Sequence, residues 1–140
     1  MQYAVEFISE LSANDAGDLL AMFADAEFAD ISDGVEWLHA AVANSLAAAA
    51  VRDRSGRLIG FIRALGDGVS DCYIQDVVVR SDHRGQGIGK ALVIAMLEHL
   101  KARNIDWIGL IATPGNAEFY RRLGFEELTG FTPMRLKNSR

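Results

Sequence analysis

Residues 72–100 constrain the fold of this chain more than any other stretch, because a strand pattern passes through a glycine-rich turn into a helix pattern. Residues 73–79 are mostly β-branched or aromatic and have the length of a strand. From Ile88 onward, apolar residues recur at helical spacing. The turn at residues 84–89 holds three glycines, which let backbone N–H groups approach a ligand, and the helix N-terminus adds free donors and a positive dipole end. This unit predicts an anion site, most often a site for phosphate.

The spacing inside the turn separates three known phosphate motifs. A Walker A loop requires glycine at the position of Arg84 and Ser or Thr at the position of Ala91. A Rossmann fingerprint requires its third glycine where Lys90 stands. The spacing that does match is Gln/Arg-x-x-Gly-x-Gly/Ala, through Arg84, Gly87 and Gly89. In this the turn resembles the acyl-CoA pyrophosphate loop of the GCN5-related N-acetyltransferases (GNAT). The alternative is a turn that only caps the helix.

The remaining chain predicts a mixed α/β sandwich of one domain, residues 1–140, without linkers or repeats. Three further helices are expected, with caps at Asn14, at Ser32 or Asp33, and at Asn116. Strands are expected at residues 3–8, 46–52, 58–64, 72–79, 107–111, 125–128 and 134–136.

Charge and composition limit the functions that are open to the chain. The net charge is −5, but residues 1–51 carry nine acidic side chains and no Lys or Arg, whereas residues 52–140 carry fourteen basic ones. An acidic first third suits a cationic acceptor, or is a solvated face of the early helices; a basic remainder suits a polyanionic cofactor. Nucleic-acid binding is disfavoured. With one Cys72, no metal-ligand spacing, no signal peptide and no membrane-length apolar run, a cytoplasmic location is the default expectation.

A second segment, residues 116–125 (NAEFYRRLGF), resembles the GNAT segment that ends in an aromatic residue and Gly-Phe. In that family the Asn contacts the pantetheine arm of the cofactor, and the Tyr lies near the thioester sulfur. The matching residues here are Asn116 and Tyr120, which are four residues apart and so share a helix face. The alternative for Tyr120 is an ordinary core aromatic residue. Together the two motifs lie within residues 72–125, in the family's order.

The resemblance implies a GNAT fold, with a mostly antiparallel mixed sheet of six to seven strands, splayed central strands and about four helices. It implies acetyl-CoA as cosubstrate, with the pantetheine arm and the acyl group along the strand edge and the diphosphate on the turn. The implied cofactor-binding residues are Val77, Val78, Val79, Arg84, Gly85, Gln86, Gly87, Ile88, Gly89, Lys90, Asn116 and Tyr120.

The chemistry implied is direct acetyl transfer to a primary amine, which must lose a proton before it attacks. Asp76 is the first candidate for the base and for contact with the acceptor; the alternatives are a water relay to another acid, or an Asp76 that only pairs with an arginine. Tyr120 is expected to protonate the departing thiolate. Phe28 and Trp37 are expected to border the acceptor pocket.

Three stretches, residues 61–64, 73–79 and 110–112, also look like the plant-plastid and bacterial arylalkylamine (serotonin-type) branch of the family. This favours a small, arylalkyl amine as acceptor. Acetylation of a protein lysine or N-terminus remains open, as does a non-catalytic acyl-CoA sensor. Dimers are frequent in the family, and strands from Phe125 onward would be able to pair in a homodimer.

Overall fold

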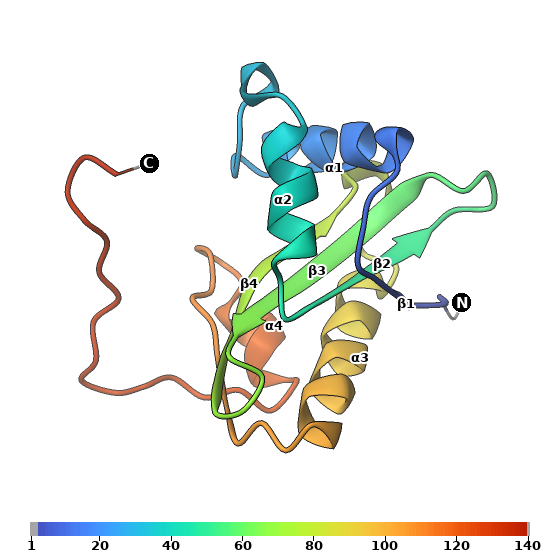
Figure 1. Ribbon diagram of the computed structural model, residues 1–140. Coiled ribbons are helices and arrows are strands. Elements are labelled where there is room, and N and C mark those ends of the chain that lie inside the picture. Colours follow the sequence, from blue (N-terminus) through green and yellow to red (C-terminus); the bar gives the residue numbers. More distant parts are fainter. Residues whose placement is uncertain (1–2, 140) are drawn as a thin grey trace. The chain divides into compact units, whose positions relative to one another are not determined.

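The computed structural model describes residues 3–139, which form five strands, four α-helices and two short 3-10 turns (Figure 1). In chain order the elements are β1 (Glu6–Ile8), α1 (Ala13–Asp25), η1 (Ile31–Asp33), α2 (Glu36–Ala43), β2 (Ala47–Arg52), β3 (Leu58–Gly66), β4 (Asp71–Val79), η2 (Ser81–His83), α3 (Ile88–Ala102), β5 (Trp107–Gly109) and α4 (Ala117–Arg121).

The chain divides into two compact units, Met1–Leu110 and Ile111–Arg140. The first unit contains the whole sheet, in the order β1-β2-β3-β4-β5. All neighbours are antiparallel except β4 and β5, which run parallel. The expectation of a single acetyltransferase domain over residues 1–140 stays a prediction.

Two layers of helix cover the sheet of the first unit. Side chains of α1 and α2 share one apolar cluster with Phe61 of β3 and Val78 of β4. Side chains alternate between the two faces of a strand, so Gly60 of β3 lies on the opposite face, against Ile88 and Leu92 of α3. The sheet is therefore buried on both faces at β3 (Figure 1).

Local sequence explains where α1 begins. Asn14 was expected as the cap, but Ser12 has this role: its hydroxyl accepts the Asp15 N–H at 3.0 Å, and the Asp15 carboxylate accepts the Ser12 N–H at 3.5 Å. This is a capping box, which satisfies two free donors at once. The second helix also begins later than expected, at Glu36, because residues 31–33 form η1 under an Asp30 cap.

The second unit contains α4 and otherwise irregular chain. The strands expected at residues 125–128 and 134–136 are absent, so the sheet has five strands and not six to seven. In this segment Phe131, Met134 and Leu136 are exposed, and no strand within residues 3–139 pairs with them. Without a neighbouring strand, β-favouring residues alone do not form a ladder.

No helix among residues 3–139 has both the length and the apolar character that crossing a bilayer demands.

Candidate functional site

The glycine turn leaves a run of backbone donors open at the start of α3. Gly85 and Gly87 have φ of 76° and 84°, a left-handed conformation that favours glycine. Gly87 is the N-cap of α3 and has no side-chain cap, and the first N–H with an intrahelical acceptor is that of Ala91, to Gly87 O at 3.0 Å. Within the described chain, no acceptor is found for the N–H groups of residues 84–90. Such a cluster at a helix N-terminus suits an anionic group.

Side chains hold the turn through hydrogen bonds that do not use those N–H groups. Arg84 Nε donates to Val79 O at 3.3 Å, and its Nη2 contacts Asp25 Oδ2 of α1 at 3.0 Å. The Tyr3 hydroxyl donates to Gln86 Oε1. Lys90 is exposed and makes no ion pair within residues 3–139. Because the Arg84–Asp25 pair is itself exposed, it contributes little and the arginine remains available to an anion.

The edge of β4 beside this turn has no strand partner. β5 pairs with β4 only from Asp71 to Tyr73, so within residues 3–139 the edge from Ile74 to Val79 is open. The edge is open because β5 ends at Gly109, and the splaying of the central strands stays a prediction. This opening begins close to Gln75, the extra residue of a β-bulge between the pairs Ala64–Ile74 and Arg63–Asp76.

Hydrogen-bond register shows which groups face the open edge. The Arg80 N–H donates to Ile59 O at 2.8 Å, which makes these two residues a hydrogen-bonded antiparallel pair. Hydrogen-bonded and non-hydrogen-bonded pairs alternate, so Val78 directs its backbone groups toward β3. Val77 and Val79 direct theirs away, toward the open edge. Val77 thus presents its N–H and C=O there and Val79 its N–H, since the Val79 C=O accepts from Arg84 Nε at 3.3 Å; the Val78 side chain packs in the apolar cluster with α1.

Aromatic side chains gather on the α1/α2 face of the sheet, where the acceptor was predicted. The Phe23 ring lies at the centre, with Phe28 at 5.9 Å and Trp37 and Phe61 at 6.0 Å between ring centroids. Phe28 and Trp37 are both half-buried, so each keeps part of its surface accessible. The structure therefore brings the two predicted acceptor residues to one cluster.

Asp76, the candidate base, lies in an ion pair on that same face. Arg63 Nε donates to Asp76 Oδ2 at 2.6 Å, and only 15 % and 12 % of the two side chains are exposed. The sequence left open that Asp76 pairs with an arginine, and it does. Its role as base stays a prediction.

The second unit holds the remaining predicted residues. Asn116 is the N-cap of α4, but its side chain makes no cap hydrogen bond; its Nδ2 donates to Thr113 Oγ1 at 2.6 Å. Tyr120 packs between the rings of Phe119 and Phe125, at 4.9 and 5.8 Å. Burial raises the pKa of Tyr120 above its ordinary value, which makes ionisation of the hydroxyl still less favourable.

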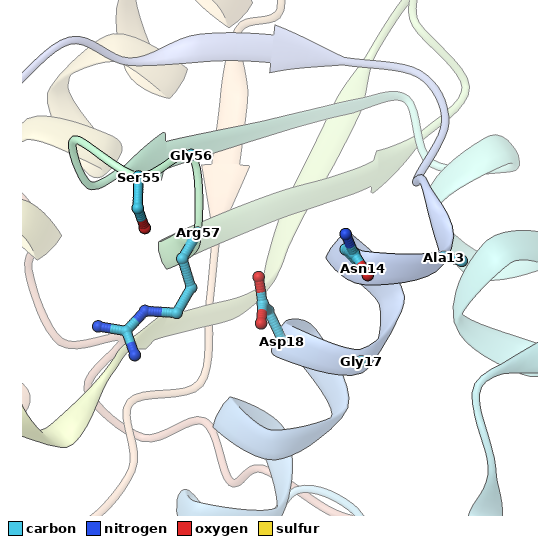
Figure 2. A pocket seen from close by; sticks show the side chains of 7 residues that line it. All are labelled: Ala13, Asn14, Gly17, Asp18, Ser55, Gly56 and Arg57. Carbon is cyan, nitrogen blue, oxygen red and sulfur yellow. The ribbon is translucent and has the colours of Figure 1, made fainter.

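A surface groove of about 470 Å³ lies elsewhere, between the start of α1 and the β2–β3 turn. In Figure 2, Asn14 and Asp18 project from α1 and Ser55 and Arg57 come from the turn. Asp18 Oδ2 accepts the Leu58 N–H at 3.1 Å and so joins the helix to β3. None of the predicted site residues lines this groove.

Sequence reasoning missed two residues that shape the site. Gly60 permits α3 to approach β3, and Arg63 holds Asp76. A signal for Arg63 was present, since it is the one charged residue in the otherwise apolar run of residues 58–66. Its partner was not predictable, because the bulge at Gln75 sets which residue of β4 faces it.

Comparison with known proteins places these features in a family. Residues 41–127 match the family described as "Acetyltransferase (GNAT) domain". Histone acetyltransferase TAP1 of Glycine max is 46 % identical over 70 residues, which are 50 % of this chain and 30 % of that protein. Serotonin N-acetyltransferase 2, chloroplastic, of Oryza sativa is 39 % identical over 71 residues, 51 % of this chain and 36 % of that protein.

The likeness extends to solved structures. A GNAT-family acetyltransferase from Streptococcus pneumoniae superposes with a TM-score of 0.80 and 26 % identity, covering 99 % of this chain and 100 % of that one. The matches to curated relatives span between 28 % and 58 % of those relatives' own length. With the family match over residues 41–127, the glycine turn and the open β4 edge thus have a common explanation: this chain belongs to the GNAT acetyltransferase family.

Proposed function

We propose that this chain transfers the acetyl group of acetyl-CoA to a primary amine. The observation that carries the proposal is the run of unpaired N–H groups at residues 84–90, directly beside the open edge at Val77 and Val79. Diphosphate is the anion that suits a glycine-rich helix N-terminus, and an amide-bearing arm suits a strand edge that lacks a partner. Coenzyme A carries both groups in one molecule.

The residues of the turn would bind and neutralise the diphosphate. Backbone N–H groups from Gly85 to Gly89 would donate to its oxygens, and Lys90 and Arg84 would add positive charge. Arg84 would exchange its exposed contact with Asp25 for the phosphate, at small cost.

The edge of β4 would orient the acyl end. Val77 and Val79 would pair with the amides of the pantetheine arm as a neighbouring strand does, and a Val77 or Val79 N–H would donate to the thioester oxygen as charge develops there. When bound, acetyl-CoA supplies the thioester carbonyl carbon that the amine attacks; an amide N–C bond forms, the C–S bond breaks, and one proton is released overall. Tyr120, whose burial disfavours ionisation of the hydroxyl, would donate to the departing thiolate.

A small amine is the acceptor that the first unit supports best. The half-buried rings of Phe28 and Trp37 around Phe23 would provide apolar walls for such a molecule. The names of two relatives point in different directions, one to histone and one to serotonin. Acetylation of a protein lysine or N-terminus is therefore the second candidate. A cytoplasmic location and a homodimer stay predictions.

The test is a thiol-release assay with acetyl-CoA against arylalkylamines, polyamines, amino acids and lysine peptides. Release that depends on one class of amine is the expected result. Tight binding of coenzyme A by calorimetry, without release with any amine, would replace the enzyme by an acyl-CoA sensor. Absence of coenzyme A binding would overturn the proposal altogether.

A further inference from the structure

Two of the arginine–aspartate pairs in the first unit, Arg52–Asp15 and Arg63–Asp76, differ in how fully their hydrogen-bonding atoms are used. In the first, Arg52 binds Asp15 through two parallel hydrogen bonds, Nη1 to Oδ1 at 2.7 Å and Nη2 to Oδ2 at 2.9 Å. The same guanidinium also donates to Glu6 and to Gly56 O. Each nitrogen of the Arg52 guanidinium thus donates to the protein, and these hydrogen bonds join α1, β1, β2 and the β2–β3 turn. This pair has the geometry of a structural contact.

The Arg63–Asp76 pair is joined by a single bond. Arg63 Nε donates to Asp76 Oδ2 at 2.6 Å, and no other hydrogen bond of either side chain is present within residues 3–139. This leaves Asp76 Oδ1 and both Nη atoms of Arg63 without a protein partner. Buried polar atoms are normally satisfied. Although the side chains are only 12 % and 15 % exposed, none of these atoms is sealed from solvent.

The strand register places the pair on the predicted acceptor face. Arg63 follows Phe61 by two residues on β3, and Asp76 precedes Val78 by two on β4, so all four lie on the face covered by α1 and α2. Phe61 belongs to the aromatic cluster around Phe23, at 6.0 Å. The next residue of β4, Val77, directs its backbone to the edge where the acyl group is expected.

We propose that the Arg63–Asp76 pair is a receptor for an α-amino acid, whose ammonium group Asp76 binds and whose carboxylate Arg63 binds through its two Nη atoms. The inference rests on the proposed function, and it names the acceptor as a free amino acid with an aromatic or large apolar side chain. A half-satisfied ion pair offers one negative and one positive site a few ångströms apart, which is the charge pattern of a zwitterion. A planar guanidinium is the usual bidentate partner of a carboxylate.

The decisive comparison uses three acceptors that differ only at the carboxylate: phenylalanine, phenylalaninamide and 2-phenylethylamine. The kcat/KM for phenylalanine is expected to exceed that for each of the other two by about tenfold or more. A hydrogen bond to a charged group contributes enough free energy to account for such a factor. Phenylalaninamide also represents a peptide N-terminus, since it lacks the negative charge. Equal kcat/KM values for the three would overturn the inference.

Variants of the Arg63–Asp76 pair test whether this pair causes the preference for an acceptor with a carboxylate. Arg63→Gln should lower the ratio of kcat/KM for phenylalanine to that for 2-phenylethylamine to near one. The double variant Arg63→Gln/Asp76→Asn removes both charges and leaves no unpaired buried ion; because Asp76 is also the candidate base, this variant is used for the binding measurement and not for the kcat/KM ratio. Arg57→Gln removes a guanidinium of similar charge that pairs with Asp53 outside this face, and it should keep the wild-type ratio. An unchanged ratio in a folded Arg63→Gln protein, as judged by circular dichroism, would contradict the inference.

A binding readout separates this inference from the proposed function. In the presence of coenzyme A, phenylalanine should raise the melting temperature of the wild-type protein but not that of the double variant. Such a shift without any acetyl transfer would support the receptor and reject the enzyme. Transfer to amines without a carboxylate preference would support the enzyme and reject the receptor. Neither binding nor transfer with phenylalanine would reject the receptor.

Discussion

Gly60 offers a way to move the start of α3 without touching any residue of the glycine turn. A Cβ placed at Gly60 would lie 2.6 Å from Ile88 Cγ2 and 3.0 Å from Leu92 Cδ1. Ordinary contact begins at 3.4 Å, so the first of these distances is short by about 0.8 Å. Ile88 is β-branched and lies in the first turn of α3, where one χ1 rotamer is strongly preferred, so that relieving the contact by side-chain rotation is costly. The helix is expected to shift instead.

We expect Gly60→Ala to weaken coenzyme A binding more than it weakens the fold. Overpacking costs about 1–3 kcal/mol, partly offset by the roughly 0.5–1 kcal/mol that alanine gains over glycine in a regular element. A shift of nearly 1 Å between the N–H groups of the turn and the β4 edge should raise the Kd for coenzyme A about tenfold, or 1.4 kcal/mol. Calorimetry gives the Kd, and urea unfolding gives the free energy of unfolding.

Gly17→Ala is the matched control. Gly17 lies in α1, with open space around the position of a Cβ, so alanine should stabilise the helix by up to about 1 kcal/mol and leave the Kd unchanged. A Gly60→Ala protein that binds coenzyme A with the wild-type Kd would refute the reasoning, because the approach of α3 to β3 would then have no bearing on the site.

Three other changes address separate parts of the account. Gly87→Ala places a side chain at φ 84°, which should cost about 1–2 kcal/mol of stability and raise the Kd for coenzyme A; calorimetry with unchanged affinity would count against the turn. Tyr120→Phe should lower kcat about tenfold without abolishing transfer, because a thiol is a fair leaving group; equal kcat in steady-state assays would remove its role as acid. The Arg52 hydrogen bonds hold the pKa of Asp15 below its ordinary value, so their contribution to stability is complete above pH 4 and disappears as the pH falls through the lowered pKa. In urea unfolding, Asp15→Asn should therefore cost about 2–3 kcal/mol at pH 7 and progressively less as the pH falls below the ordinary pKa of an aspartate, and a cost that does not fall with pH would be the contrary result.

The sequence predicted the elements whose patterns are local. The apolar runs of β2, β3 and β4 and the helical spacing of α3 are visible in the residues themselves, and so is the turn between β4 and α3. The strand expected at residues 125–128 does not form: only Phe125 of this segment favours a strand, and no strand within residues 3–139 pairs with it.

The sequence predicted those residues of the candidate site that belong to a local motif, and it did not predict contacts between distant parts of the chain. Motif spacing identified the turn and Tyr120, because those residues are adjacent in the chain. The Arg63–Asp76 pair depends on the register between two strands, which a bulge at Gln75 changes by one residue. The contact of Arg84 with Asp25 joins residues 59 positions apart, and no local pattern indicates it.

The central claim is that the N–H groups of residues 84–90 hold the diphosphate of coenzyme A beside the edge at Val77 and Val79. Nuclear magnetic resonance of the ¹⁵N-labelled protein tests it directly, through the amide shifts during titration with coenzyme A. The account predicts the largest shifts at residues 84–90 and at Val77 and Val79, with little change at Gly56. Shifts confined to the groove around Gly56, or absent from the turn at saturation, would contradict it.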